Sequence, residues 1–202
     1  MTKWNRKYGE AGTRLFGDAP NTLIATQVPH LHPRPQTVLC LADGDGRDGT
    51  WLAQQGFAVT AVDLSEVGTV QARHHDQVAG VTVHRIVADL ADWQPPRTQR
   101  WDLITMSFLQ CESAVRQRVV QQVRHWLQPG GYCLIEGFSS QGLTASTEGP
   151  KDPDLLYDRE TVQNWLEGLI IHLCEDAQVE LDQGISHVGT GHVIRVCAQQ
   201  PI

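Results

Sequence analysis

Long apolar runs, basic clusters and paired cysteines are all scarce in this sequence of 202 residues. No apolar segment approaches the roughly 20 residues of a membrane-spanning helix, so we expect no membrane partner. Residues 1–7 also lack the apolar core of a signal peptide. The five cysteines stand without CxxC spacing, which is typical of reduced thiols buried as small hydrophobes. These features predict a cytoplasmic protein.

Positive charge is also sparse, because 16 Lys and Arg residues stand against 23 Asp and Glu residues, for a net charge of -7. Nucleic-acid-binding domains normally carry a basic face, so we expect no nucleic-acid partner and favour a small molecule instead. The nine histidines show no metal-ligand spacing, and we therefore expect no metal cofactor. Nothing in the sequence indicates an oligomeric state.

The length and the 41% hydrophobic content suit one α/β domain with a sizeable core, predicted over residues 1–202. Residues 1–35 hold scattered aromatic residues, several glycines and prolines, and a helix that Asn21 would cap. This segment is either an arm packed on the core or a lid over a ligand site, and both interpretations stay open. Residues 36–202 form the predicted core.

Strand-like and helix-like segments alternate along the core, which indicates βαβ units and a parallel sheet. Strands are expected over 37–41, 57–63, 81–87, 101–109 and 132–138. Helices are expected over 47–55, 65–79 and 115–127, the last with a clear 3.6-residue apolar stripe. A long loop over 139–158 and a partly helical segment over 155–166 follow. Two closing strands, within 168–182 and 192–198, would be joined by a hairpin connection over 183–189.

The turn after the first strand is rich in glycine, with Gly44, Gly46 and Gly49 ahead of a helix. Glycine lets the backbone approach a ligand closely, and the first amides of a helix point toward it. The spacing satisfies the dinucleotide fingerprint, but this short pattern is weak evidence alone. It fails as an EF-hand because Arg47 stands at a ligand position, and it fails as a P-loop because no Gly-Lys-Ser/Thr follows.

Carboxylates follow successive strands of the predicted sheet. Asp43, Asp63 and Asp89 each come directly after an apolar strand. Because ligands of open α/β sheets bind outside the carboxyl ends of the strands, we expect these side chains at one edge. Any one of them alone would more often cap a helix or carry a solvated charge. Three in register favour a nucleoside.

The order and spacing of these motifs resemble class I S-adenosylmethionine (SAM)-dependent methyltransferases, closest to the small TehB-like and Methyltransf_11/23-type branch. The matching segments are 38–47, 59–65, 88–90, 101–104 and 127–132. Three positions depart from the family pattern. Cys40 replaces an acidic residue, Ala42 replaces the first loop glycine, and Gln110 stands where relatives often have His.

The resemblance implies a Rossmann-like, three-layer α/β fold with helices on both faces of a seven-stranded sheet. The implied strand order is 3-2-1-4-5-7-6, with strand 7 antiparallel. It also implies SAM as cofactor and S-adenosylhomocysteine (SAH) as product. Asp63 would bind the ribose hydroxyls and Asp89 the adenine amine. The implied cofactor-binding residues are Ala42, Asp43, Gly44, Gly46, Arg47, Asp63, Leu64, Ala88, Asp89, Leu90 and Ser107.

The methyl acceptor is expected to be a small nucleophile, a thiol, an amine or an oxyanion of the tellurite type. Candidate substrate contacts are Trp4, Arg6, Tyr8, Gln110 and His187. His187 is the candidate proton acceptor, because an unperturbed histidine has a pKa near ~6.5. The alternative, that it merely pins the hairpin, is favoured. Methyl transfer can proceed by positioning alone, so a catalytic dyad is not required.

Two alternatives remain. One is a SAM-binding protein without catalysis, which the changes at Cys40 and Ala42 leave open. The other is an NAD(P)-linked oxidoreductase, disfavoured because Asp43 and Asp45 would face the pyrophosphate and no catalytic domain follows.

Overall fold

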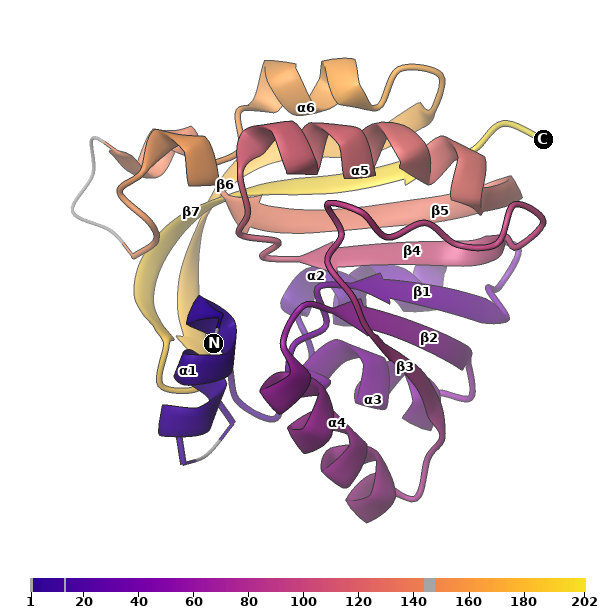
Figure 1. Cartoon of the computed structure of the whole chain (residues 1–202). Coiled ribbons are helices and arrows are strands. Elements are labelled where there is room, and N and C mark those ends of the chain that lie inside the picture. Colours follow the sequence, from indigo (N-terminus) through magenta and orange to yellow (C-terminus); the bar gives the residue numbers. More distant parts are fainter. Residues whose placement is uncertain (1, 13, 144–147) are drawn as a thin grey trace.

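Seven strands form one sheet with the order β3-β2-β1-β4-β5-β7-β6 (Figure 1). The structure is a computed structural model that describes residues 2–12, 14–143 and 148–202. β1 to β5 run parallel, while β7 is antiparallel to both β5 and β6. The predicted strand order and the antiparallel seventh strand are therefore confirmed. The strands are β1 (Thr37–Leu41), β2 (Ala58–Asp63), β3 (Val83–Val87), β4 (Trp101–Ser107), β5 (Leu127–Phe138), β6 (Ile170–Gln183) and β7 (His187–Gln199).

The helices between the strands begin and end where local sequence dictates. In α4, the hydroxyl of Ser65 accepts a hydrogen bond from the amide of Gly68 at 3.0 Å, and Gly80 ends the helix at φ 68°. Both ends were predicted from these residue types. The helices are α1 (Lys3–Glu10), α2 (Thr22–Gln27), α3 (Arg47–Gln54), α4 (Glu66–Ala79), α5 (Ser113–Trp126) and α6 (Arg159–Trp165), with short 3₁₀ turns η1 (Val28–His30), η2 (Ser140–Leu143) and η3 (Pro153–Leu155).

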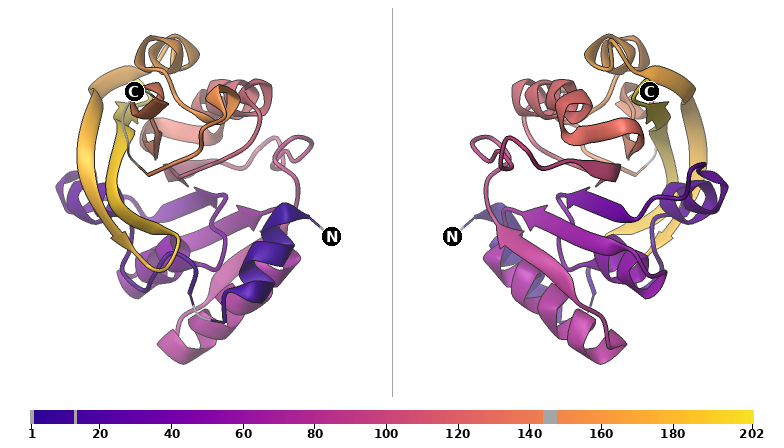
Figure 2. Two further views of the ribbon diagram at one scale, coloured as in Figure 1. Left: turned by 90° about the vertical axis from the view of Figure 1, so that its left-hand side faces the viewer. Right: turned by 90° about the vertical axis from the view of Figure 1, so that its right-hand side faces the viewer.

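The sheet is buried on both faces, which explains why its central strands are almost wholly apolar. In β1, Leu39 and Leu41 pack with the α5 side chains, whereas Val38 and Cys40 pack with α2 and α3. Successive side chains of a strand point to opposite faces of the sheet, so β1 contributes to two separate hydrophobic clusters. Figure 2 shows the sheet between these layers, with α5 and α6 apart from α2, α3 and α4.

The arm differs from its prediction in one respect, because residues Lys3–Glu10 form a helix, α1. Its N-cap is Thr2, whose hydroxyl accepts from the amide of Asn5 at 3.0 Å. The α2 cap is as predicted, since the side chain of Asn21 accepts from Leu23 N at 2.9 Å. α1 contains neither Ala nor Leu and holds Gly9, so propensity alone gave little indication of it.

The predicted long loop over 139–158 is partly ordered by short elements, η2 and η3, in the residues that the structure describes. Tyr157 forms an isolated bridge with Ser139 and is only 1% exposed. The following helix, α6, begins at Arg159 rather than at Leu155, because Asp158 caps it by accepting from Thr161 N at 2.9 Å.

The C-terminal hairpin is longer than predicted. Gln183 pairs with His187, so the connection is only 184–186 and His187 is the first residue of β7. The expectation that His187 lies in a loop is therefore wrong. β6 and β7 bend away from the rest of the sheet toward α1 (Figure 1). There, the amide of Ser186 donates to the carbonyl of Leu15 at 3.2 Å.

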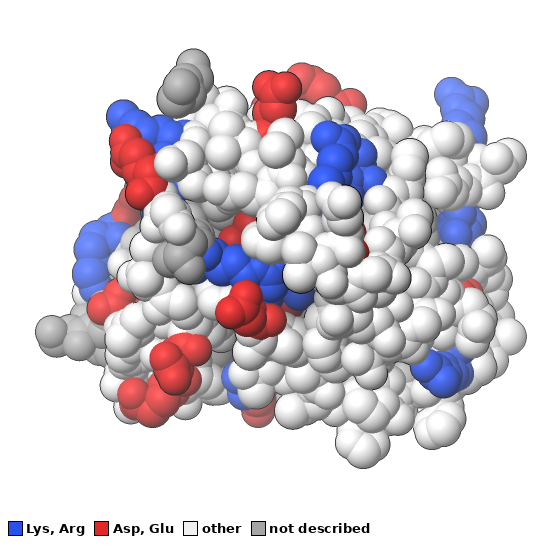
Figure 3. Space-filling view, turned by 90° about the horizontal axis from the view of Figure 1, so that it is seen from below, with Lys and Arg blue, Asp and Glu red and all other residues white. Residues whose placement is uncertain are grey.

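Among the described residues, no helix is long and apolar enough to cross a membrane, and no group of three His, Cys, Asp or Glu side chains is placed to hold a metal ion. The five cysteines are free thiols, and Cys40, Cys133, Cys174 and Cys197 are buried, as predicted. On the face seen in Figure 3, the Lys and Arg side chains are scattered among acidic ones.

Candidate active site at the carboxyl ends of the strands

A pocket with an empty volume of about 880 Å³ opens at the carboxyl ends of the parallel strands. It brings together segments from the arm, from β1, β2 and β4, and from the hairpin. Predicted residues that line it are Trp4, Tyr8, Ala42, Asp43, Arg47, Asp63, Leu64, Asp89, Leu90, Ser107, Gln110 and His187. Lining residues that were not named as site candidates are Phe16, Asp48, Phe108, Leu109, Cys111 and Val115. Four predicted residues, Arg6, Gly44, Gly46 and Ala88, are not among the lining residues.

The turn after β1 is held by the side chain of Asp43. One carboxylate oxygen accepts from the amide of Gly49 at 2.9 Å, and the other lies 2.7 Å from Nη1 of Arg85. Arg85 also pairs with Asp76 at 2.6 Å. Burial raises the pKa of Asp43 to about 6, although the charge of Arg85 opposes the rise. These bonds order the loop without the acidic residue that Cys40 replaces.

Gly46 leaves room for close packing beside the turn. It has a φ of 85° and precedes α3, and a Cβ there would lie 2.5 Å from Nη2 of Arg85 and 2.8 Å from the Cβ of Ala72. No larger side chain fits without moving the arginine. The close approach of Arg85 is therefore one physical reason for a glycine at this position.

Ala42 adopts a left-handed conformation with φ 57°. The family pattern has glycine here, and only glycine reaches this region without strain. The amide of Ala42 donates to the carbonyl of Val62 at 2.8 Å, which keeps the start of the turn against β2. The fold thus retains the backbone conformation after the glycine is lost.

Asp63 lies at the end of β2 with both carboxylate oxygens engaged by backbone. It accepts from Gly44 N at 2.8 Å and from Ser65 N at 2.7 Å. Burial is the main reason that its pKa is raised. Each oxygen keeps a further lone pair, so the carboxylate can still accept hydrogen bonds from two adjacent hydroxyl groups. This arrangement fits a ribose diol.

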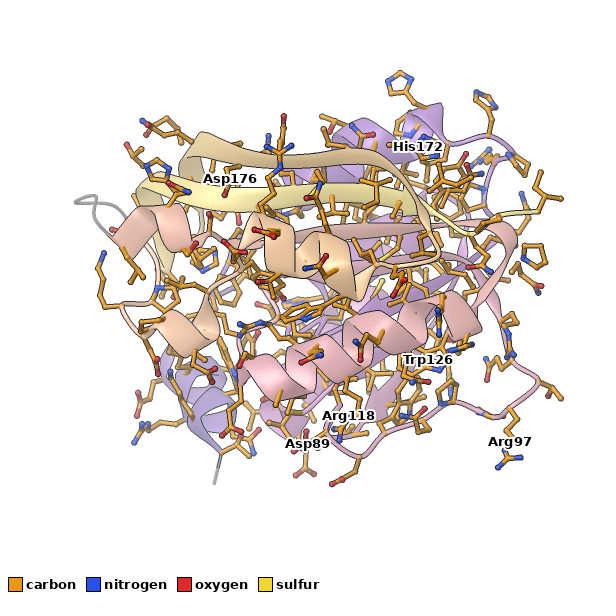
Figure 4. All side chains as sticks on the ribbon, turned by 90° about the horizontal axis from the view of Figure 1, so that it is seen from above. Asp89, Arg97, Arg118, Trp126, His172 and Asp176 are labelled. Atoms are coloured by element: carbon orange, nitrogen blue, oxygen red, sulfur yellow. The ribbon has the colours of Figure 1, made fainter. Side chains whose placement is uncertain are left out.

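Two leucines and a second carboxylate continue the same wall. Leu64 is 38% exposed and Leu90 is 8% exposed, and both line the pocket. Asp89 is exposed, and its Oδ1 accepts from Ala91 N at 2.8 Å. Figure 4 shows Asp89 at the edge of the molecule near Arg118. Adenine is a flat ring with an amino group at its edge. Leu64 and Leu90 offer apolar contact to such a ring, and the carboxylate of Asp89 can accept a hydrogen bond from the amino group.

The arm covers one side of the pocket. Tyr8 is 5% exposed and packs against Gly44 and Gly68, where a Cβ on Gly68 would lie 3.0 Å from its ring. Trp4 lies 6.1 Å from Tyr8, centroid to centroid. Burial, followed by the charge of Asp63, raises the pKa of the Tyr8 hydroxyl. Arg6 is exposed and lies outside the pocket, because α1 turns Trp4 and Tyr8 inward instead.

His187 is enclosed by aromatic rings. Its ring centroid lies 4.6 Å from Phe16, 4.6 Å from Phe108 and 5.1 Å from Phe138. Burial lowers the pKa of His187 to about 3, and the charges of Arg47 and Lys7 add to the effect. The structure therefore does not give His187 the expected pKa near neutrality, and at pH 7 its ring is neutral and only weakly basic.

Arg47 lines the pocket, but its guanidinium group is engaged in hydrogen bonds within the protein. Nη1 donates to the carbonyl of Phe16 at 3.1 Å and to Oε1 of Gln183 at 2.9 Å. Nε lies 3.6 Å from Asp48. Arg47 thus ties the arm to the hairpin across the start of α3. Sequence spacing gave no indication of this, because residues 16, 47 and 183 are far apart in the chain.

A seven-stranded sheet of this order, with a pocket at its strand ends, defines the fold of class I SAM-dependent methyltransferases. The family comparison agrees, because residues 38–131 match the family described as a methyltransferase domain. The resemblance indicated by the sequence motifs is thereby confirmed. The match covers the turn after β1, the strand ends at Asp63 and Asp89, and the strands β2, β3 and β4.

Solved structures share the fold at low sequence identity. One, from work on the conversion of a disulfide bond into a thioacetal group during echinomycin biosynthesis, has a TM-score of 0.75 and 21% identity over 97% of this chain and 88% of that chain. TehB from Haemophilus influenzae has a TM-score of 0.71 and 16% identity over 88% of this chain and 61% of that chain. A SAM-dependent methyltransferase from Clostridium acetobutylicum ATCC 824 has a TM-score of 0.67 and 16% identity over 89% and 90%. The comparison with curated proteins finds no match.

Proposed function

We propose that this protein binds SAM in the pocket at the strand ends and transfers its methyl group to a small-molecule nucleophile. The observation that carries the proposal is the placement of Asp63 and Asp89 at neighbouring strand ends, each beside a pocket-lining leucine. This arrangement suits an adenosine group. The carboxylate of Asp63 matches the ribose diol, that of Asp89 matches the exocyclic amine of adenine, and the two leucines match the apolar ring.

Each protein group has a defined task in this proposal. Asp63 accepts the ribose hydroxyls, Leu64 and Leu90 hold the adenine ring, and Asp89 accepts from its amine. Ser107 and the backbone at Ala42 border the remaining part of the pocket. When bound, SAM supplies an electrophilic methyl group on a sulfonium. The side chains need only hold the two reactants in line, because positioning supplies much of the rate in such a displacement.

Calorimetric titration with SAH tests the proposal directly. We expect saturable binding of SAH and no comparable binding of NADH. Asp43, Asp63 and Asp89 line the pocket, and Arg47 already donates to Phe16 and Gln183, so the pyrophosphate of NADH would meet carboxylates without a cation to pair with. Tight binding of NADH without heat from SAH would refute the proposal. Methyl transfer from SAM to thiol, amine and oxyanion acceptors then separates an enzyme from a SAM-binding protein without catalysis, for which turnover should be absent with every acceptor.

A further inference from the structure

Another part of the pocket is chemically different from the wall that carries Asp63 and Asp89. It is built from Phe16 of the arm, Phe108 after β4 and His187 at the start of β7. His187 lies 4.6 Å from each of the two phenylalanine rings, centroid to centroid. Phe108 holds a φ of 51°, a conformation that non-glycine residues adopt rarely and mainly where the surroundings enforce it. Three distant segments thus form one aromatic wall.

This wall contains a polar atom without a partner. Nδ1 of His187 is buried and makes no hydrogen bond within the described chain, and the residue is only 6% exposed. Oγ of Ser107, a residue that also lines the pocket, is likewise buried and unpaired. Buried polar atoms in native proteins nearly always have a partner. Two unpaired ones in the same pocket indicate a ligand group that completes them.

The charge of the lining disfavours an anionic acceptor. Among the lining residues that the structure describes, Arg47 is the only Lys or Arg, and its Nη1 already donates to Phe16 and Gln183. Its Nε faces Asp48 at 3.6 Å. Aspartates, by contrast, contribute four lining residues: Asp43, Asp48, Asp63 and Asp89. An oxyanion or a thiolate would enter an acidic pocket without a free cation to receive it.

Building on the proposed function, we propose that the methyl acceptor is an uncharged amine on an apolar body. The body packs against Phe16 and Phe108, and the amine N–H donates to Nδ1 of His187, in the tautomer protonated on Nε2. The nitrogen lone pair forms the new N–CH₃ bond while the C–S bonding pair returns to sulfur. The positive charge moves from sulfur to nitrogen, and the product ammonium releases its proton to water after leaving the pocket.

An amine suits this wall better than an alcohol or a thiol, because an amine can be methylated without first losing a proton in the pocket. Burial lowers the pKa of His187 to about 3, so the imidazole accepts a hydrogen bond but does not take the proton. A neutral O–H or S–H acceptor has to lose its proton for methylation to be complete, and His187 does not receive it. The aromatic faces also tolerate the cation that an amine leaves behind.

The test compares acceptors that share one ring. We propose to measure binding of aniline, phenol and thiophenol to the SAH-loaded protein by calorimetry, and methyl transfer from SAM to each of them and to tellurite. We expect aniline to bind, with a kcat/KM about tenfold or more above the others. Preference for phenol, thiophenol or tellurite would overturn the amine assignment, as would failure of aniline to bind. Failure of SAH itself to bind would instead refute the proposed function.

Variants of His187 test the hydrogen bond. In H187F we expect the KM for aniline to rise about threefold to tenfold, the effect of one lost neutral hydrogen bond, with SAH affinity unchanged. In H187N, whose side-chain oxygen can replace Nδ1 as acceptor, the KM should stay within about twofold of the natural protein. This second variant keeps the test decisive if H187F fails to fold. Equal KM values in all three proteins would overturn the role of His187.

His172 provides the matched histidine control. It is exposed near the start of β6, and its Nε2 lies 2.9 Å from Oε1 of Gln199. Figure 4 shows His172 and Asp176 at separate places along this strand. In H172F we expect an unchanged KM for aniline. Phe16→Ala should raise that KM by about tenfold or more, because it removes much of the apolar contact area. An unchanged KM in the Phe16 variant would overturn the aromatic wall as the acceptor site.

Discussion

Arg85 of β3 and Asp43 of the turn after β1 form a buried ion pair, with Nη1 and Oδ2 2.7 Å apart and both side chains 2% exposed. The pair crosses the intervening strand β2, and Arg85 is anchored again by Asp76 of α4 at 2.6 Å. It explains how the chain orders its glycine turn with Cys40 in place of an acidic residue. The family's usual carboxylate is missing, and an arginine from another strand holds the turn instead.

Arg85→Met should strongly destabilise the protein. The change leaves Asp43 and Asp76 buried without their cation, and breaking a buried pair in this way costs about 3–5 kcal/mol. Urea unfolding measures the loss. The control is Arg97→Met, at an exposed site, where we expect a change within about 0.5 kcal/mol. Equal stability of the two variants would contradict the role of the ion pair.

Asp63→Asn should weaken SAH binding. The amide keeps one acceptor oxygen but loses the charge, and a hydrogen bond to a charged group contributes about 1.5–3 kcal/mol, or roughly tenfold to a hundredfold in Kd. Calorimetry measures the Kd, and Asp18→Asn, at an exposed carboxylate of the arm, is the control. Unchanged affinity would show that SAH does not use this strand end.

The stability of the protein should depend on His187 in acid. Its pKa is lowered to about 3 by burial, against an ordinary value of 6.5, so between these values the unfolded chain binds a proton that the folded chain excludes. The stability contributed by neutral His187 is therefore complete above pH 6.5 and falls as the pH drops toward 3, with a limiting slope of about 1.4 kcal/mol per pH unit.

The comparison of natural protein and H187F isolates this effect. Asp43 acts in the opposite direction, because its pKa is raised to about 6, and the folded state gains protons as the pH falls through that value. Both proteins share Asp43, so its contribution cancels in the difference between them. Urea unfolding from pH 7 to pH 4 provides the two curves. Parallel curves would show that the His187 ring is hydrated rather than buried.

Gly44→Ala should loosen the arm. Gly44 has a φ of 57°, and a Cβ on it would overlap the hydroxyl of Tyr8. We expect faster trypsin cleavage after Lys7 and Arg14, measured by mass spectrometry. Gly9→Ala is the control in the same arm, because no atom lies within 4 Å of its Cβ position. It should slow cleavage, since alanine favours a helix by about 1 kcal/mol over glycine. Similar cleavage of both variants would contradict the contact between Tyr8 and the turn.

The sheet and the acidic strand ends were predictable from sequence because they depend on local patterns. Apolar runs such as 37–41 mark a strand buried on both faces, and Ser65 and Gly80 mark the ends of α4. Once the strands are parallel, Asp63 and Asp89 must lie at the same edge. The order of these segments along the chain was enough to predict the fold.

Tertiary structure decided the functions of individual side chains. Gly46 has the same sequence signal as a ligand-binding glycine, yet Arg85 occupies the space beside it. Phe16, Phe108 and His187 meet only because the hairpin bends toward the arm, and no local pattern links them. The pKa of His187 follows from that enclosure. Sequence thus determined which backbone edge presents the carboxylates, whereas burial and long-range packing decided what each side chain there can do.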